Sequence, residues 1–159
     1  MQECSNKVIQ HGEIVSFDTD MVGPYGYCAD ISRAFVVGNK FNDEQKKLYS
    51  MAMEQIDYNS RLIKDGLSFK EFADKSWNLP EDYYPNRYSV MVHGIGLCDE
   101  WPAIRYPTDG GEKNGTFQKN MTITVESYIG KVGGKEGVKL EQQYLIGENG
   151  LELMSHHPL

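Results

Sequence analysis

Three aspartates lie within one short stretch of this chain, and their type and spacing indicate a metal site. Asp18, Asp20 and Asp30 belong to the run Phe-Asp-Thr-Asp-Met-Val-Gly-Pro-Tyr-Gly-Tyr-Cys-Ala-Asp, which begins at residue 17. Three carboxylates directed into one cleft would repel one another unless a cation lay between them, and hard divalent ions take oxygen ligands. The stretch therefore predicts a bound cation with further ligands elsewhere in the chain.

Those further candidate ligands are His93, Glu126 and Glu141. The two-residue spacing of Asp18 and Asp20 predicts that they share one face of a strand. Five carboxylates and one imidazole suit two divalent ions such as iron, manganese or zinc, since the positive charges of two ions nearly offset five negative ones. Any one of these acids, taken alone, is more often a solvated surface residue. The joint pattern is what favours a metal centre.

The elements that must position these residues are strands, then helices, then strands again. The first strands are expected over residues 13–20 and 27–37, joined by the Gly-Pro-Tyr-Gly turn at 23–26. A helix follows, capped by Asn42 and Gln45 and ended by Gly66, and a second, shorter helix opens at Ser68 and runs through about Trp77.

A long loop is expected after the strand at 89–93, and three further strands follow over residues 121–128, 137–146 and 151–154. The last two form a hairpin across the Glu-Asn-Gly turn at 148–150. The order of elements favours an α+β fold with a curved, largely antiparallel sheet covered by helices.

Composition narrows the class of protein. The chain has 159 residues, enough for one ordinary domain, and a net charge of -7 without a cluster of lysines and arginines, which argues against a nucleic-acid partner. No apolar run is long enough to span a membrane, and the start lacks a secretory signal pattern. The three cysteines, Cys4, Cys28 and Cys98, are odd in number and have neither Cys-x-x-Cys nor zinc-finger spacing, so reduced, buried thiols in a cytoplasmic protein are expected.

Four sequence blocks resemble the metal-binding blocks of the pita-bread superfamily, which includes methionine aminopeptidase, aminopeptidase P, prolidase and creatinase. The blocks are Asp-Ile-Ser-Arg at 30–33, His-Gly-Ile-Gly at 93–96, Thr-Val-Glu at 124–126 and Gly-Val-Lys-Leu-Glu at 137–141. The resemblance spans Val15 to Met154. It implies the pita-bread (creatinase/aminopeptidase-like) fold, incomplete in this chain, and a metal-dependent enzyme.

Three departures separate the chain from the peptidases of that superfamily. The peptidases carry Asp-x-Gly in the first strand, with eleven residues to the second Asp, whereas this chain reads Asp18-Thr-Asp20. Their histidine block contains a second His that helps to bind substrate, whereas His93-Gly-Ile-Gly-Leu-Cys-Asp99 is one residue shorter and has none. Ser127 also replaces the usual proline. The first two departures weaken the case for peptide hydrolysis.

The same departures are similar to the pattern of the pita-bread type of dimethylsulfoniopropionate (DMSP) lyase, the DddP branch. This resemblance implies β-elimination of DMSP to dimethyl sulfide and acrylate, with Asp99 as the catalytic base. It implies substrate-binding roles for Tyr88 and Trp101, whose rings would hold the sulfonium cation. The metal ligands implied are Asp18, Asp20, Asp30, His93, Glu126 and Glu141. Without the resemblance, Asp99 would be read as a loop or capping acid, and the two rings as packing residues.

The resemblance also implies a wider setting. Residues 1–159 are expected to be the C-terminal part of the metal-binding catalytic domain, with the N-terminal domain and the first part of the catalytic domain outside this chain, and the full-length protein is expected to be a homodimer. Two divalent ions per site are implied, with iron favoured over zinc or manganese. The alternatives are a metal-dependent Xaa-Pro aminopeptidase or dipeptidase and a non-catalytic module that binds a protein.

Overall fold

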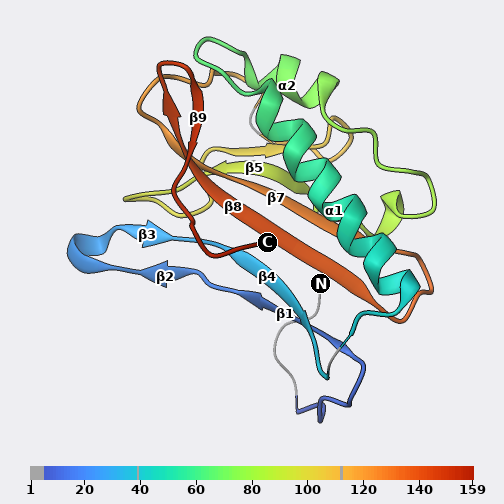
Figure 1. Ribbon diagram of the computed structural model, residues 1–159. Coiled ribbons are helices and arrows are strands. Elements are labelled where there is room, and N and C mark those ends of the chain that lie inside the picture. Colours follow the sequence, from blue (N-terminus) through green and yellow to red (C-terminus); the bar gives the residue numbers. More distant parts are fainter. Residues whose placement is uncertain (1–5, 39, 112) are drawn as a thin grey trace.

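The computed structural model describes residues 6–38, 40–111 and 113–159, which form an antiparallel sheet, two helices and a strand ribbon (Figure 1). The main sheet has five strands in the order β6-β5-β7-β8-β9. Its strands are β5 (Val90–Gly94), β6 (Ala103–Arg105), β7 (Thr122–Gly130), β8 (Gly137–Gly147) and β9 (Gly150–Leu153). All its pairings are antiparallel, which confirms the α+β architecture expected from the sequence.

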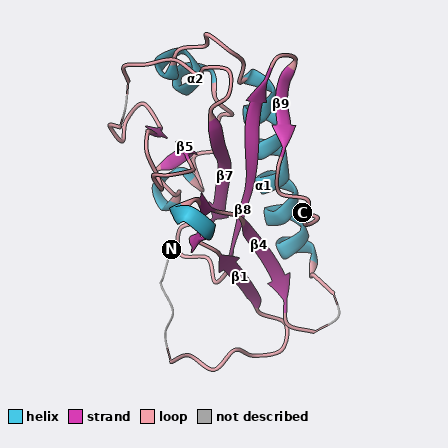
Figure 2. Cartoon of the chain, turned by 90° about the vertical axis from the view of Figure 1, so that its left-hand side faces the viewer, coloured by secondary structure: helices cyan, strands magenta, loops and turns pink. Residues whose placement is uncertain are grey.

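One face of this sheet is apolar and is covered by α1 (Asp43–Leu62), as Figures 1 and 2 show. The helix buries Leu48, Ala52 and Ile56. Alternate residues of β7 and β8, among them Val125 and Leu140, are completely buried in the same core. Because side chains alternate between the faces of a strand, the residues between these apolar positions must lie on the opposite face. That opposite face carries Glu126 and Glu141.

The polar face of the sheet is covered by a ribbon of strands on which the three aspartates lie. The ribbon comprises β1 (Ile14–Asp18) paired with β4 (Ser32–Val36), and β2 (Met21–Val22) paired with β3 (Cys28–Ala29). The half formed by β1 and β4 lies beside β8 in both views (Figures 1 and 2). Asp18 is the last residue of β1, whereas Asp20 and Asp30 fall in the interruption between the two halves of the ribbon.

A side chain causes that interruption, which the sequence pattern did not predict. The hydroxyl of Thr19 donates to the carbonyl oxygen of Ile31 at 3.0 Å and lies 3.4 Å from its N–H. It therefore takes the place of a regular backbone pairing, and the expected continuous strands over 13–20 and 27–37 are each divided. The two-residue alternation consequently does not extend from Asp18 to Asp20.

The helices begin where their capping residues predict. Asn42 and Gln45 form a reciprocal capping box at the start of α1, and the hydroxyl of Ser68 accepts from the N–H of Glu71 at the start of α2 (Phe69–Lys75). The hairpin of β8 and β9 also forms as expected. The expected long loop after β5, by contrast, contains strand β6, whose three residues are too few to show a periodic pattern.

A buried arginine holds the C-terminal segment against the ribbon. The Arg33 guanidinium donates to the carbonyl oxygens of Glu141 (2.5 Å), His157 (2.5 Å) and Pro158 (2.9 Å), and to the side chain of Gln142 (2.6 Å). A guanidinium presents five N–H donors in a fixed plane, so one side chain can fix several carbonyl groups at once. Arg33 thereby joins β4, β8 and the last residues of the chain beside the Glu141 position.

Candidate metal centre

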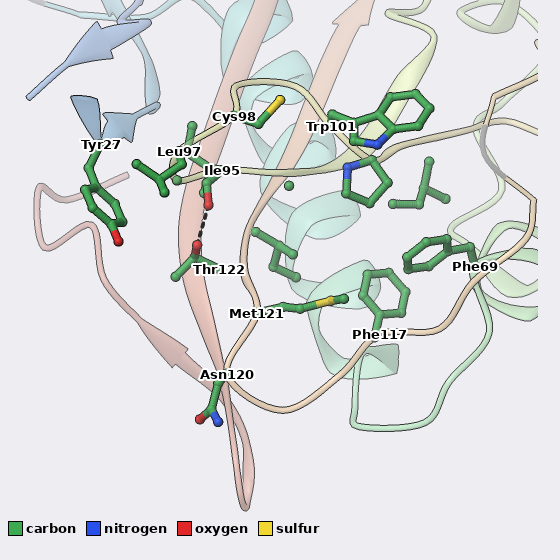
Figure 3. Close-up of a pocket in the computed structure, with 15 residues that line it drawn as sticks. Tyr27, Phe69, Ile95, Leu97, Cys98, Trp101, Phe117, Asn120, Met121 and Thr122 are labelled. Carbon is green, nitrogen blue, oxygen red and sulfur yellow. Dashed lines mark hydrogen bonds between the residues drawn. The ribbon is translucent and has the colours of Figure 1, made fainter. Parts of the chain in front are cut away.

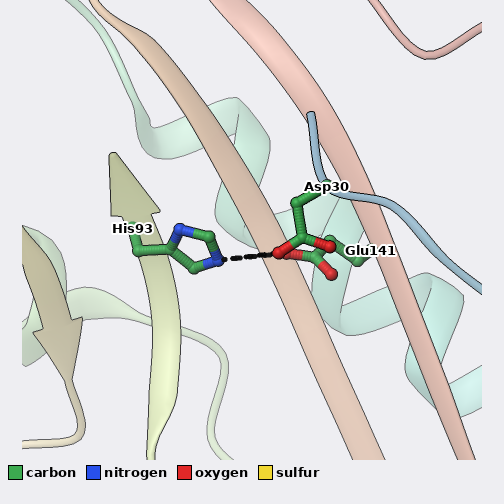
Figure 4. Close-up of side chains that lie close together, drawn as sticks. All are labelled: Asp30, His93 and Glu141. Carbon is green, nitrogen blue, oxygen red and sulfur yellow. Dashed lines mark hydrogen bonds and ion pairs between the residues drawn. The ribbon is translucent and has the colours of Figure 1, made fainter. Parts of the chain in front are cut away.

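Four buried side chains, three from strands of the sheet and Asp30 from the interruption of the ribbon, converge on the polar face of the sheet. His93 lies on β5, and Glu126 and Glu141 are directly opposite each other on β7 and β8. From the Nε2 atom of His93, the nearest carboxylate oxygens are those of Glu141 at 3.2 Å, Asp30 at 3.6 Å and Glu126 at 3.8 Å. Figure 4 shows His93, Asp30 and Glu141 directed at one another.

These separations fit the ligand shell of a single divalent ion. Donor atoms about 2.1 Å from one ion lie about 3.0–3.4 Å apart in octahedral or tetrahedral geometry. In addition, Asp30 Oδ1 and Glu126 Oε1 are buried without a hydrogen bond from any residue that the structure describes. A buried acceptor without a partner is costly, and a cation is the partner that a carboxylate cluster best accepts. The residues present therefore fit a divalent metal.

Burial and mutual repulsion oppose ionisation of two of these carboxyl groups when no metal is bound. Burial raises the pKa of Asp30 to about 9, and the charges of Glu141, Asp18 and Asp20 act in the same direction. Burial likewise raises the pKa of Glu126 to about 8, despite the nearby ammonium of Lys139. Both groups would hold a proton near neutral pH in the metal-free chain.

The His93–Glu141 pair has the opposite character. Burial alone would lower the pKa of His93, but its hydrogen bond to Glu141 and the charges of Glu126 and Glu141 raise it to about 9. Burial would raise the pKa of Glu141, but the bond to His93 and the charge of Lys139 lower it to about 2. In the metal-free chain, the pair is therefore a protonated His93 imidazolium that forms an ion pair with the ionised Glu141 carboxylate.

Asp18 is held differently from the other predicted ligands. Its Oδ1 accepts from the Ser32 hydroxyl at 2.5 Å, and its Oδ2 lies 3.1 Å from the Nζ atom of Lys139. Lys139 is buried and also forms an ion pair with Glu126, its Nζ atom lying 2.7 Å from Oε2. Burial would lower the pKa of Lys139, but the charges of Glu126, Glu141 and Asp18 raise it above its ordinary value. Lys139 is therefore an ammonium ion.

Sequence reasoning did not identify Lys139 as part of the centre. A signal was present, because Lys139 stands two residues before Glu141 and must share its face of β8.

A second acidic group forms beside the first. Carboxylate oxygens of Asp20, Asp30 and Asp99 lie within 4.8 Å of one another, Asp30 being buried and Asp99 half-buried. The ribbon and the loop after β5 are joined here, because the N–H of Cys28 donates to the carbonyl oxygen of Gly96 at 2.7 Å. Asp99 thus lies next to a predicted ligand rather than apart from the centre.

Gly94 allows the loop that carries Asp99 to return against β5. A Cβ atom at this position would lie 2.2 Å from the carbonyl oxygen of Trp101 and 2.8 Å from Pro102. No other residue could occupy this position without displacing the loop backbone. The glycine that follows His93 is therefore a steric requirement for the position of Asp99.

The two predicted substrate-binding rings lie in different surroundings. The Tyr88 ring lies 4.7 Å from Nζ of Lys139, and its hydroxyl is 3.4 Å from Glu100. Trp101 is 61 % exposed and borders a mainly apolar cavity of about 370 Å³ with Leu97, Cys98 and Phe117 (Figure 3). Gly94 and Ile95, which follow His93, form part of its wall.

The expectation of buried thiols is wrong for Cys98, which is exposed, while Cys28 is partly buried. Cys98 lies in the exposed part of the loop after β5, at the border of the cavity and between the exposed side chains of Leu97 and Trp101. Cys4 lies outside the described residues.

The metal-free protein is expected to lose stability between pH 6 and 9. The raised pKa values of Asp30 and Glu126 mean that the folded chain binds more protons than the unfolded chain in this window, so unfolding becomes easier as pH rises. His93 acts in the same direction. The stability that its raised pKa contributes is fully present below pH 6.5 and is lost as pH rises through about 9. Glu141 contributes above pH 4.5 and loses its effect only towards pH 2.

A bound divalent ion displaces these protons, so its stabilising effect should grow over the same window. Thermal unfolding in EDTA and in excess Mn²⁺, measured at several pH values, checks both trends. A metal-free Tm that rises with pH, or a metal effect that does not change, would contradict the assigned protonation states.

Comparison with known proteins places this geometry in a family. The chain matches the metallopeptidase family M24 over residues 1–148. It is 40 % identical over 99 % of its length to a protein of Roseovarius nubinhibens named dimethylsulfoniopropionate lyase DddP, and 32 % identical over 92 % of its length to an Xaa-Pro dipeptidase of Pyrococcus horikoshii. The chain spans 36 % and 40 % of the length of these relatives.

Solved structures show the same fold. The prolidase from Pyrococcus horikoshii matches 97 % of the chain with a TM-score of 0.80 at 28 % identity, and the prolidase from Pyrococcus furiosus matches 98 % with a TM-score of 0.79 at 26 % identity. The chain covers 43 % and 44 % of those structures. These neighbours confirm the expected pita-bread fold. Together with the match over most of its sequence, they show that this chain belongs to the metallopeptidase family M24.

Proposed function

We propose that the protein carrying this chain is a metal-dependent carbon–sulfur lyase that converts DMSP to dimethyl sulfide and acrylate. The observation that carries the proposal is the group formed by Asp20, Asp30 and Asp99. Asp20 replaces the glycine of the peptidase pattern, and Asp99 lies in the loop from which the second histidine of that pattern is missing. The chain therefore places an additional acid at each of two positions where the peptidase pattern differs, and the fold brings them together.

The similarity to proteins named DMSP lyase supports the same function. In addition to the Roseovarius relative, a protein of this name from Roseobacter denitrificans is 38 % identical over 99 % of the chain. The chain covers only 36 % of either relative, so their activity is transferred to this protein as a proposal.

The reaction requires a base beside an anion-binding centre. Asp99 would take the proton from the carbon next to the substrate carboxylate. The electrons of that C–H bond form the C=C bond of acrylate, and the C–S bond breaks with its electron pair leaving on dimethyl sulfide. Asp99 suits this task because it is half-buried and is oriented by the N–H of Glu100, which donates to its Oδ1 at 3.1 Å. The mainly apolar cavity with Trp101 at its border would receive the dimethylsulfonium group.

We propose two positions for divalent ions, with iron favoured and zinc or manganese as alternatives. His93, Asp30, Glu126 and Glu141 would hold the first ion, and Asp20 with Asp30 would contribute to the second. When bound, such ions supply a Lewis acid for the substrate carboxylate. The role of the chain's own residues is to orient the substrate and to keep Asp99 beside the carbon that loses its proton.

An Xaa-Pro dipeptidase is the second candidate. The similarity to an Xaa-Pro dipeptidase and to solved prolidases favours it, as does the complete set of family ligand positions. The loop from His93 to Trp101 lacks the second histidine of the peptidase pattern, which weighs against it.

One assay distinguishes the candidates. The protein expressed from its complete gene, loaded with Fe²⁺ or Mn²⁺, is incubated separately with DMSP and with Xaa-Pro dipeptides. Gas chromatography measures dimethyl sulfide, and amino-acid analysis measures hydrolysis. Sulfide release without hydrolysis is the expected result. Dipeptide cleavage without sulfide release would overturn the lyase proposal in favour of the peptidase, and no turnover of either substrate would favour a binding module.

The remaining proposals concern the setting of the enzyme. We propose a cytoplasmic homodimer whose N-terminal domain and first part of the catalytic domain lie outside residues 1–159. The family match and the coverage of about two fifths of its relatives support the domain proposal. Among the described residues, no helix is long and apolar enough to cross a membrane. Sedimentation of the full-length protein tests the dimer.

A further inference from the structure

Ser127, which stands where the peptidase pattern has a proline, belongs to a buried hydrogen-bond network on the apolar face of the sheet. Its hydroxyl donates to the side-chain oxygen of Gln55 on α1 at 2.6 Å, and the amide nitrogen of Gln55 donates to the hydroxyl of Tyr106 at 2.6 Å. All three residues are buried. A buried polar group is costly unless it is hydrogen-bonded, so each of the three side chains holds the next in place.

One end of this network lies next to a predicted metal ligand. Ser127 follows Glu126 on β7, and because successive side chains of a strand alternate, Ser127 faces α1 while Glu126 faces the metal centre. Among the described residues, the pairing of β7 with β5 ends at Val125, whereas its pairing with β8 continues to Gly130. The bond from Ser127 to Gln55 therefore holds β7 against α1 just where β5 ceases to support it.

The other end lies next to the predicted substrate-binding ring of Tyr88. The N–H of Tyr106 donates to the carbonyl oxygen of Ser89 at 3.3 Å. The guanidinium of Arg87 lies 5.1 Å from the centre of the Tyr106 ring. Since Tyr88 lies between Arg87 and Ser89 in the chain, the network extends from the residue after a predicted ligand to the two neighbours of that ring.

We propose that Ser127, Gln55 and Tyr106 are positioning residues that set the position of Glu126 relative to Tyr88, and so of the metal centre relative to the bound substrate. A proline would fix the backbone at this position through its ring and would offer no hydroxyl. The serine fixes it through a bond to α1, and that bond continues to Tyr106. The inference rests on the proposed metal centre and lyase function, and it gives a role to the third departure from the peptidase pattern.

The test compares Ser127→Ala with Tyr106→Phe, each of which removes one hydroxyl. Either change leaves one end of the buried Gln55 amide without a partner, which favours a shift of β7 against α1. Because the network joins both ends, each single change should both weaken Mn²⁺ binding and raise the KM for DMSP, by about threefold to thirtyfold, the range for mutations along a packed network. Ser127→Thr, which keeps a hydroxyl, should restore most of the loss.

The double variant gives a second readout. Ser127→Ala and Tyr106→Phe interrupt the same network, so the double variant should lose little more than the more affected single variant. Independent structural effects would instead multiply.

Asn59→Ala is the matched control. Asn59 is buried on the same helix, one turn after Gln55, and its side-chain oxygen accepts from the N–H of Trp77 at 2.8 Å. The substitution removes a buried hydrogen bond outside the network. It should therefore lower the Tm and leave both the Mn²⁺ affinity and the KM unchanged.

All measurements use the protein expressed from its complete gene. Calorimetric titration of the metal-free protein with Mn²⁺ gives the affinity, sulfide release at increasing DMSP concentration gives the KM and kcat, and thermal unfolding gives the Tm. If Ser127→Ala does not fold, Ser127→Cys takes its place, because a thiol is similar in size to the hydroxyl group and a weaker donor.

The outcomes separate this inference from the proposed function. A lower Tm with unchanged Mn²⁺ affinity and unchanged KM overturns the positioning role, as does an equal loss in Asn59→Ala or a double variant whose loss is the product of the single ones. These results leave the metal-dependent lyase standing. If the unmodified protein binds Mn²⁺ but releases no sulfide, the lyase function fails, and the Mn²⁺ affinities of the variants still decide whether the network positions Glu126.

Discussion

Glu141→Gln is expected to weaken binding of the divalent ion beside His93 by at least about 100-fold, since loss of an outer-shell partner alone already costs 10–100-fold. Glu141 is completely buried, and its carboxylate contacts His93 at 3.2 Å and the Ser32 hydroxyl at 2.9 Å. The amide that replaces it is similar in size but neutral, so the shape of the site is kept while a ligand charge is lost. Release of dimethyl sulfide should fall in parallel with metal content.

The experiment compares metal content after dialysis with the rate of sulfide release, both on the full-length protein. Glu148→Gln is the matched control, because Glu148 is an exposed glutamate that pairs with Lys119 outside the centre. It should retain both metal and turnover. If Glu141→Gln binds the metal as the unmodified protein does, then the cluster around His93 is not the metal site.

Asp99→Asn is expected to lower the rate of sulfide release by about 10²–10⁴-fold, the usual contribution of a general base, and to leave metal content unchanged. The amide cannot accept the substrate proton, although it can still accept the N–H of Glu100 that orients Asp99. Asp99→Glu should restore part of the rate and alter its pH profile, which a purely structural role would not do. Measurements at saturating DMSP separate the loss of turnover from a loss of binding.

Glu100→Gln is the control for that experiment, because it makes the same change of charge in the next residue of the loop. The amide oxygen of the glutamine can still accept from the Tyr88 hydroxyl, which lies 3.4 Å from Glu100, so the effect on turnover should be small. Asp99 lies close to Asp20 and Asp30, so metal content decides between two roles. If Asp99→Asn loses an ion together with its activity, Asp99 is a metal ligand and another group must act as the base.

The sequence correctly predicted the elements that depend on interactions between residues close together in the chain. The capping box at Asn42 and Gln45 and the cap at Ser68 involve neighbours in sequence, so their side chains determine where each helix begins. The turn at residues 148–150 fixes the register of the hairpin in the same way. The division of the ribbon was not predictable, because the hydroxyl of Thr19 replaces a backbone pairing only once Ile31 lies beside it.

The sequence by itself determined the set of metal-binding residue types, their order and the family to which they belong, because residue identity and spacing carry that information. Only the tertiary structure decided which of those residues contact one another. In the folded chain, Asp18 contacts Ser32 and Lys139, and Asp20 lies close to Asp99. Three carboxylates surround the buried ammonium of Lys139. These relations depend on distances of a few ångströms between strands far apart in the chain. Electrostatic energy changes steeply over such distances, so spacing along the sequence cannot specify them.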